Sequence, residues 1–107
     1  MLLLNAFSPN MLDRRGGSVL VRFTTIDEMA AIELFHREPL ESAVGHKATA
    51  KILTQKLGLE VRFNRATVRL GPGSRAVLAQ YIGPRLDEKA TELPVGAQIE
   101  FMMAEIC

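Results

Sequence analysis

Apolar and polar residues alternate with a period of two in several stretches of the chain, a pattern typical of strands with one buried face. The alternation is clearest around Val19–Thr24 and from Ala97 to Met103. Leu2–Phe7 is instead a short apolar run that is ended by the turn-forming Ser8-Pro9-Asn10. We therefore expect strands at Leu2–Phe7, Val19–Thr24, Leu59–Phe63, Ala66–Leu70, Ala76–Ile82 and Ala97–Met103.

Apolar residues at three- and four-residue steps predict a first helix between the second and third of these strands. Thr25 and Glu28 have the spacing of a capping box, in which a hydroxyl side chain and an acidic side chain satisfy the first free amides of a helix. We expect this helix to run from about Ile26 to Arg37 and to stop before Pro39. His36 lies in its last turn, where a cation complements the helix dipole and needs no further function.

The strongest helical pattern extends from Ser42 to Gly58. Gly58 suits the left-handed position just beyond a helix end. One face of this predicted helix holds Ala43, His46, Ala50, Leu53 and Leu57, and another holds Lys47, Lys51 and Gln55. This division predicts a helix that packs on the sheet with its lysine-rich face in water.

The length of 107 residues is that of one domain. An apolar share of 48% with 23% charged residues is ordinary for a chain that folds around a core. Strands outnumber helices in the pattern, and both helices fall together along the chain. We predict a single α/β domain with a mixed β-sheet of about five to six strands and two main helices packed on it.

The formal net charge of +1 argues against a protein that coats duplex nucleic acid, because such proteins must neutralise many phosphates. A small anionic ligand needs only a few cations. The sole cysteine, Cys107, can form no internal disulfide. Met1-Leu2-Leu3-Leu4 is too short for a signal peptide, and no stretch approaches the roughly 18 apolar residues of a membrane span. We expect a cytoplasmic protein with no membrane partner and no stable duplex nucleic acid partner.

His36 and His46 are ten residues apart, and neither lies in a ligand-spaced pair with another histidine or a cysteine. We therefore expect no metal and no cofactor, so that any catalysis depends on protons and cations. The position of His46 alone favours a half-buried histidine whose ring nitrogens bond to backbone. The alternative is a general acid or base at the rim of the sheet. Gly45 would let a ligand approach closely there, and the free amides of a helix start favour a phosphate.

Several other polar residues have both a surface interpretation and a binding interpretation. Arg85, after Gly83-Pro84, is either a solvated charge or a guanidinium that bonds a phosphodiester with two donors. Glu88 is either a surface carboxylate or a group that orients Arg85 or a histidine. Arg65, at the start of a predicted strand, has the same two interpretations as Arg85. Turn formation alone explains the polar residues Asn5, Ser8 and Asn10.

Taken together, these segments resemble the viral type III anti-CRISPR ring nucleases, a family of small proteins from archaeal viruses and phages with cellular relatives. The matching segments are Leu4-Asn5-Ala6-Phe7-Ser8-Pro9-Asn10-Met11-Leu12, Ser42-Ala43-Val44-Gly45-His46-Lys47-Ala48-Thr49, Asn64-Arg65, Gly83-Pro84-Arg85-Leu86-Asp87-Glu88 and Thr91-Glu92-Leu93-Pro94. They follow one another in the family's order, so the resemblance covers essentially the whole domain.

The resemblance implies a homodimer that binds cyclic tetra-adenylate, the second messenger of type III CRISPR defence, and cleaves it without a metal. It implies that His46 is the catalytic histidine and that Arg85 and Glu88 accompany it in the active site. It also implies ligand contacts from Asn5, Ser8, Asn10, Arg65 and Gln80. Two positions depart from the family pattern: Ala48 replaces a hydroxyl residue found in some members, and Lys89 stands where a glycine is expected.

The implied chemistry needs no external nucleophile, because the 2′-hydroxyl of RNA can attack the adjacent phosphate when it is held in line. The product is then linear di-adenylate with a 2′,3′-cyclic phosphate. Protonated His46 would give its proton to the leaving oxygen, and Arg85 would stabilise the charge on the phosphorane. The main alternative is a module that binds a cyclic oligonucleotide or other nucleic acid without turnover. A purely structural or interaction protein is a third interpretation.

Overall fold

The computed structural model describes every residue from Met1 to Cys107. It contains five strands, two α-helices and one short 3-10 helix. The strands are β1 (Leu2–Leu4), β2 (Val21–Ile26), β3 (Glu41–Ala43), β4 (Arg75–Ile82) and β5 (Gln98–Ile106). The helices are η1 (Pro9–Met11), α1 (Glu28–Arg37) and α2 (Lys47–Leu57). Neither α-helix has the length and apolar character needed to cross a membrane.

The five strands form one mixed sheet in the order β2-β5-β4-β1-β3. β1 is parallel to both of its neighbours, β3 and β4, whereas β5 is antiparallel to β4 and to β2. The prediction of a single α/β domain with a mixed sheet is therefore confirmed. Because β1, β3 and β4 are parallel, the segments that follow them leave the sheet at the same end.

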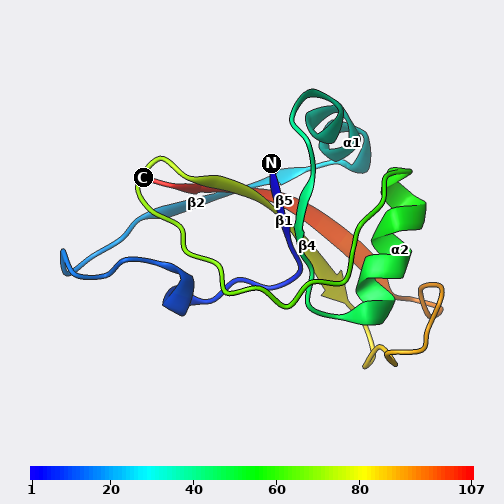
Figure 1. Ribbon diagram of the computed structural model, residues 1–107. Coiled ribbons are helices and arrows are strands. Elements are labelled where there is room, and N and C mark those ends of the chain that lie inside the picture. Colours follow the sequence, from blue (N-terminus) through cyan, green and yellow to red (C-terminus); the bar gives the residue numbers. More distant parts are fainter.

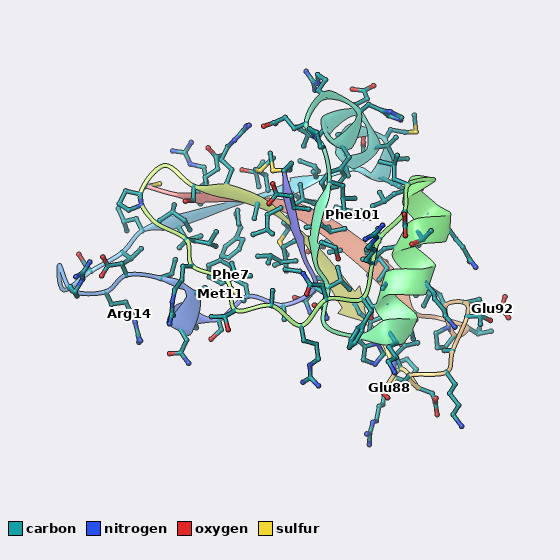
Figure 2. All side chains as sticks on the ribbon, viewed as in Figure 1. Phe7, Met11, Arg14, Glu88, Glu92 and Phe101 are labelled. Atoms are coloured by element: carbon teal, nitrogen blue, oxygen red, sulfur yellow. The ribbon has the colours of Figure 1, made fainter.

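Two different kinds of structure cover the two faces of the sheet (Figure 1). On one face, Leu3, Val77 and Phe101 belong to a buried cluster with residues of α1 and α2. On the other face, Leu4 and Leu78 pack with residues of irregular segments, among them Leu70, Phe7 and Met11. Figure 2 labels Phe7 and Met11 on this second side of the sheet. Successive residues of β1 and β4 alternate between the two clusters, as the pleat of a strand requires.

The first helix begins later than the capping-box pattern predicts. Thr25 and Ile26 extend β2, where they pair with Met102 and Phe101 of β5. Asp27 is the N-cap, and its carboxylate accepts the Ala30 amide at 2.7 Å. The predicted start at Ile26 is wrong because the pairing of β2 with β5 continues to that residue.

The second helix also begins later than predicted, because β3 occupies the first residues of the pattern. Ser42 pairs with Leu3 and Ala43 with Leu4 in the parallel β1–β3 ladder. The helix starts at Lys47 with His46 as its N-cap. Gly58 ends it in the left-handed conformation, with φ of 67°, as predicted.

The predicted strands Leu59–Phe63 and Ala66–Leu70 are wrong. These stretches make only single bridges, Phe63 with Val44 and Leu70 with Leu12. Their apolar residues act individually: Val61 is buried in the helix-side cluster and Leu70 in the opposite one. The Thr54 hydroxyl, rather than a neighbouring strand, accepts the Val61 amide at 2.9 Å. The first strand is also shorter than predicted, since it ends at Leu4.

Candidate active site

A cleft of about 920 Å³ opens where the parallel strands end. Asn5 directly follows β1, His46 follows β3 after Val44-Gly45, and Arg85 follows β4 after Gly83-Pro84. These three residues all line the cleft. Ligands of open α/β sheets usually bind beyond the carboxyl ends of the strands, where connections diverge. The parallel pairing of β1 with β3 and β4 thus explains how residues far apart in the sequence meet.

His46 combines a structural contact with a free nitrogen. The ring is half-buried, and its Nδ1 accepts the Thr49 amide at 3.2 Å as the N-cap contact of α2. In the neutral ring, an Nδ1 that accepts leaves the proton on Nε2. The Thr49 hydroxyl lies 3.1 Å from the same Nδ1. Since a hydroxyl can both donate and accept, it can bond Nδ1 whether or not that nitrogen carries a proton.

Asn5 connects the end of β1 to the segment that carries His46. Its side-chain oxygen accepts the Gly45 amide at 3.0 Å. A Cβ added at Gly45 would lie 3.3 Å from Cγ of Arg65, so the glycine allows the Arg65 side chain to approach the backbone. The glycine at position 45 therefore has a second explanation besides the predicted ligand access, namely that it leaves room for the Arg65 side chain.

The segment after β4 brings Arg85 and Glu88 to the cleft (Figure 2 labels Glu88 below the start of α2). Leu86 anchors this segment, because its side chain is buried against Ala48 and Ile52 of α2. The Asp87 carboxylate accepts the Lys89 amide at 2.8 Å, which turns the chain at this point. Arg85 and Glu88 are exposed. No side chain of the protein forms an ion pair with either of them.

The remaining predicted ligand contacts lie outside the lining of this cleft. Ser8 caps η1, and its hydroxyl accepts the Asn10 amide at 3.2 Å, while Asn10 accepts a hydrogen bond from Arg14. Gln80 points away from the cleft because it alternates along β4 with Tyr81, which lines it. Arg65 is exposed beside Gly45. The structure therefore brings together Asn5, His46, Arg85 and Glu88.

Sequence reasoning did not identify Thr49 and Tyr81 as part of the site. The three-residue spacing from His46 to Thr49 is that of an N-cap and the amide it accepts, a signal that the predicted start at Ser42 obscured. Tyr81 gave no signal of its own within the strand pattern. Lys89, which was noted as a departure from the family, also lines the cleft and adds a positive charge there.

One charged pair with a shifted pKa lies away from the cleft. The Arg15 guanidinium bonds Asp13 at 2.8 Å and holds the pKa of that carboxyl below its usual value. This pair lies on the exposed segment before β2. No three His, Cys, Asp or Glu side chains gather closely enough to hold a metal ion.

The chain matches the STIV B116-like family over residues 1–96. Two viral proteins are similar in sequence. Uncharacterized protein 26 of Sulfolobus islandicus filamentous virus (isolate Iceland/Hveragerdi) is 42% identical over 64 residues, which are 60% of this chain and 52% of that protein. Uncharacterized protein ORF116 of Acidianus filamentous virus 1 (isolate United States/Yellowstone) is 31% identical over 86 residues, 80% of this chain and 72% of that protein. The match thus spans about half the length of the first relative.

The fold is also that of a solved viral protein. The structure aligns with B116 of Sulfolobus turreted icosahedral virus with a TM-score of 0.76 and 26% sequence identity, covering 97% of each chain. The family match, the two viral relatives and this structural similarity agree with one another. The chain belongs to the STIV B116-like family.

Proposed function

We propose that this protein is a ring nuclease that cleaves cyclic tetra-adenylate into linear di-adenylate with a 2′,3′-cyclic phosphate. Its role would be that of an anti-CRISPR protein that switches off type III signalling in the cytoplasm of the host cell. The observation that carries the proposal is the cleft that gathers His46, Arg85, Glu88 and Asn5 from three separate segments. The similarity to proteins of archaeal viruses is consistent with a role against host defence.

In the proposed reaction, the 2′-hydroxyl oxygen attacks the adjacent phosphorus while the bond to the 5′-oxygen breaks, and the 2′-hydroxyl proton passes to water. Arg85 has the planar donor pair that matches a phosphodiester, and its guanidinium is not engaged by a carboxylate of the protein. It would stabilise the charge that develops on the phosphorane oxygens. Asn5 and Glu88 would keep the surrounding segments and side chains in place.

His46 would donate the proton that the leaving 5′-oxygen needs. The donor is Nε2, which faces no hydrogen-bond partner of the protein. In the protonated ring Nδ1 carries a hydrogen and no longer accepts the Thr49 amide, but the Thr49 hydroxyl can accept that hydrogen. The start of α2 favours the anionic phosphate of the ring, because the amides of Lys47 and Ala48 have no intrahelical acceptors.

The proposal is tested by incubating the purified protein with cyclic tetra-adenylate in EDTA and separating the products by chromatography. We expect linear di-adenylate with a 2′,3′-cyclic phosphate at a rate that EDTA does not change. Activity that disappears in EDTA and returns with magnesium or manganese would contradict the mechanism. Binding of the ring without any cleavage would instead identify a sequestering module.

A further inference from the structure

We infer that Tyr81 is a positioning residue that fixes Arg85 for the reaction. The Tyr81 hydroxyl donates a hydrogen bond to the Pro84 carbonyl at 2.5 Å. That carbonyl belongs to the peptide group that joins Pro84 to Arg85, so the hydrogen bond orients the backbone from which the Arg85 side chain departs. The inference rests on the proposed function, in which the Arg85 guanidinium contacts the scissile phosphate.

Tyr81 is itself firmly placed. It lies near the end of β4 and pairs with Ile99 of β5. Its half-buried side chain packs against the cluster formed by Ala48, Ile52 and Leu86. The hydroxyl therefore reaches Pro84 from a ring that the sheet and α2 both hold.

The loop between β4 and β5 begins at Gly83 and ends at Ala97, and these two residues are in close contact. A Cβ added at Gly83, whose φ is 154°, would lie 2.7 Å from Cβ of Ala97 and 3.1 Å from the Tyr81 hydroxyl oxygen. Only a glycine allows the chain to leave β4 this close to the segment that enters β5. The position of the Tyr81 hydroxyl and the path of the loop are thus set by the same close contact.

Arg85 consequently lies between two fixed neighbours. On one side, Tyr81 holds the Pro84 carbonyl, and on the other, the Leu86 side chain is buried against α2. The Arg85 side chain itself is exposed and unpaired. A cation whose backbone is fixed before the ligand arrives loses less freedom on binding and meets the transition state in the correct place.

The first test compares single-turnover rates for cyclic tetra-adenylate in the parental protein, Tyr81→Phe, Arg85→Ala and the double variant. Tyr81→Phe keeps the ring and removes only the donor. We expect it to slow cleavage by roughly 10–100-fold, because misplacement of a catalytic group has effects of that size. In the Arg85→Ala background the same substitution should cause no further loss, since Tyr81 acts through Arg85.

Thr54→Val is the matched control. The Thr54 hydroxyl donates to the Ala50 carbonyl at 2.9 Å near the far end of α2. Its loss should lower the melting temperature without changing the saturating cleavage rate. An unchanged rate in Tyr81→Phe, or equal losses with and without Arg85, would overturn the inference.

The second test does not depend on cleavage. Backbone order measured by NMR relaxation should fall at Arg85 and Leu86 in Tyr81→Phe, while the residues of β5 stay rigid. Unchanged backbone order at these two residues would overturn the inference whatever the activity. If the order falls but the parental protein cleaves no ring, the proposed function is wrong and the loop contact remains.

Discussion

His46 is held by its own helix, since Nδ1 accepts the Thr49 amide and Nε2 is left for the cleft. Two substitutions separate the capping role of His46 from its proposed role as an acid. His46→Ala removes both, and we expect the single-turnover rate to fall by about 10²–10⁴-fold while the lost cap costs about 1 kcal/mol of stability. His46→Asn retains a capping side chain but cannot donate a proton as an acid, so it should melt like the parental protein and cleave as slowly as His46→Ala.

Both variants should still bind the ring, because Arg85 and the helix amides remain. Affinity for a non-cleavable ring analogue, measured by calorimetry, checks this expectation. Cleavage by His46→Asn at the parental rate would remove His46 from the mechanism. A variant that loses binding and thermal stability together would show that the histidine serves only the fold.

Thr49 is the partner that can follow a change in the protonation of His46. The hydroxyl is 3.1 Å from Nδ1 and is buried, with 4% of the residue exposed. Thr49→Val removes the acceptor for a protonated Nδ1, so we expect the single-turnover rate at a fixed pH to fall by roughly 10–100-fold, because a hydrogen bond to a charged group contributes roughly 1.5–3 kcal/mol. Thr49→Ser retains the hydroxyl and should cleave at the parental rate; equal rates for all three proteins would contradict this role.

Arg85 contributes charge and geometry that a lysine does not reproduce. Arg85→Ala should weaken ring binding and slow cleavage, because a hydrogen bond to a charged group contributes roughly 1.5–3 kcal/mol. Arg85→Lys keeps the charge but loses the planar pair of donors, so we expect little recovery. Calorimetry with a non-cleavable ring provides the measurement. Unchanged affinity in Arg85→Ala would place this residue outside the ligand site.

At the level of elements, the sequence pattern was informative where residues have one buried face or a clear helical stripe. The patterns near β4, β5 and both helices located real elements. β3 was missed because three residues, Glu41–Ala43, are too short to show a period. The stretches 59–63 and 66–70 were misassigned because residues that cover a sheet face from outside alternate much like those of a strand.

The candidate site, too, was predictable from the sequence only in part. Arg85 follows a strand that the sequence pattern locates, whereas Asn5 falls inside the predicted strand Leu2–Phe7 and His46 inside the predicted helix, although each in fact follows a strand. Their meeting depends on β1 lying between β3 and β4, an order that no local pattern contains. The inferred role of Tyr81 depends on its hydrogen bond to the Pro84 carbonyl, and only the folded backbone reveals that contact. The family resemblance named four residues that line one cleft, and it named none of the contacts that support them.

At the scale of the whole molecule, the cleft is small for the proposed substrate. Its volume of about 920 Å³ lies within the roughly 300–1,000 Å³ usual for one drug-sized ligand. A ring of four nucleotides is larger, so one copy would cover only part of it. We therefore predict a homodimer that binds one ring across its two-fold axis, with equivalent phosphodiesters presented to the two clefts. Light scattering at micromolar concentration should give the dimer mass, and calorimetry should give one ring per two chains.

The same geometry predicts how mixed dimers behave. His46 and Arg85 of one chain line one cleft, so each active site belongs to a single protomer. A dimer that pairs an inactive His46→Ala chain with an inactive Arg85→Ala chain then contains no complete site, and mixing the two variants should restore no cleavage. Mixing either variant with the parental chain should give dimers with one working cleft, which is the matched control. Recovery of activity in the first mixture would mean that the site is assembled from both chains, and a fully active monomer would contradict the dimer itself.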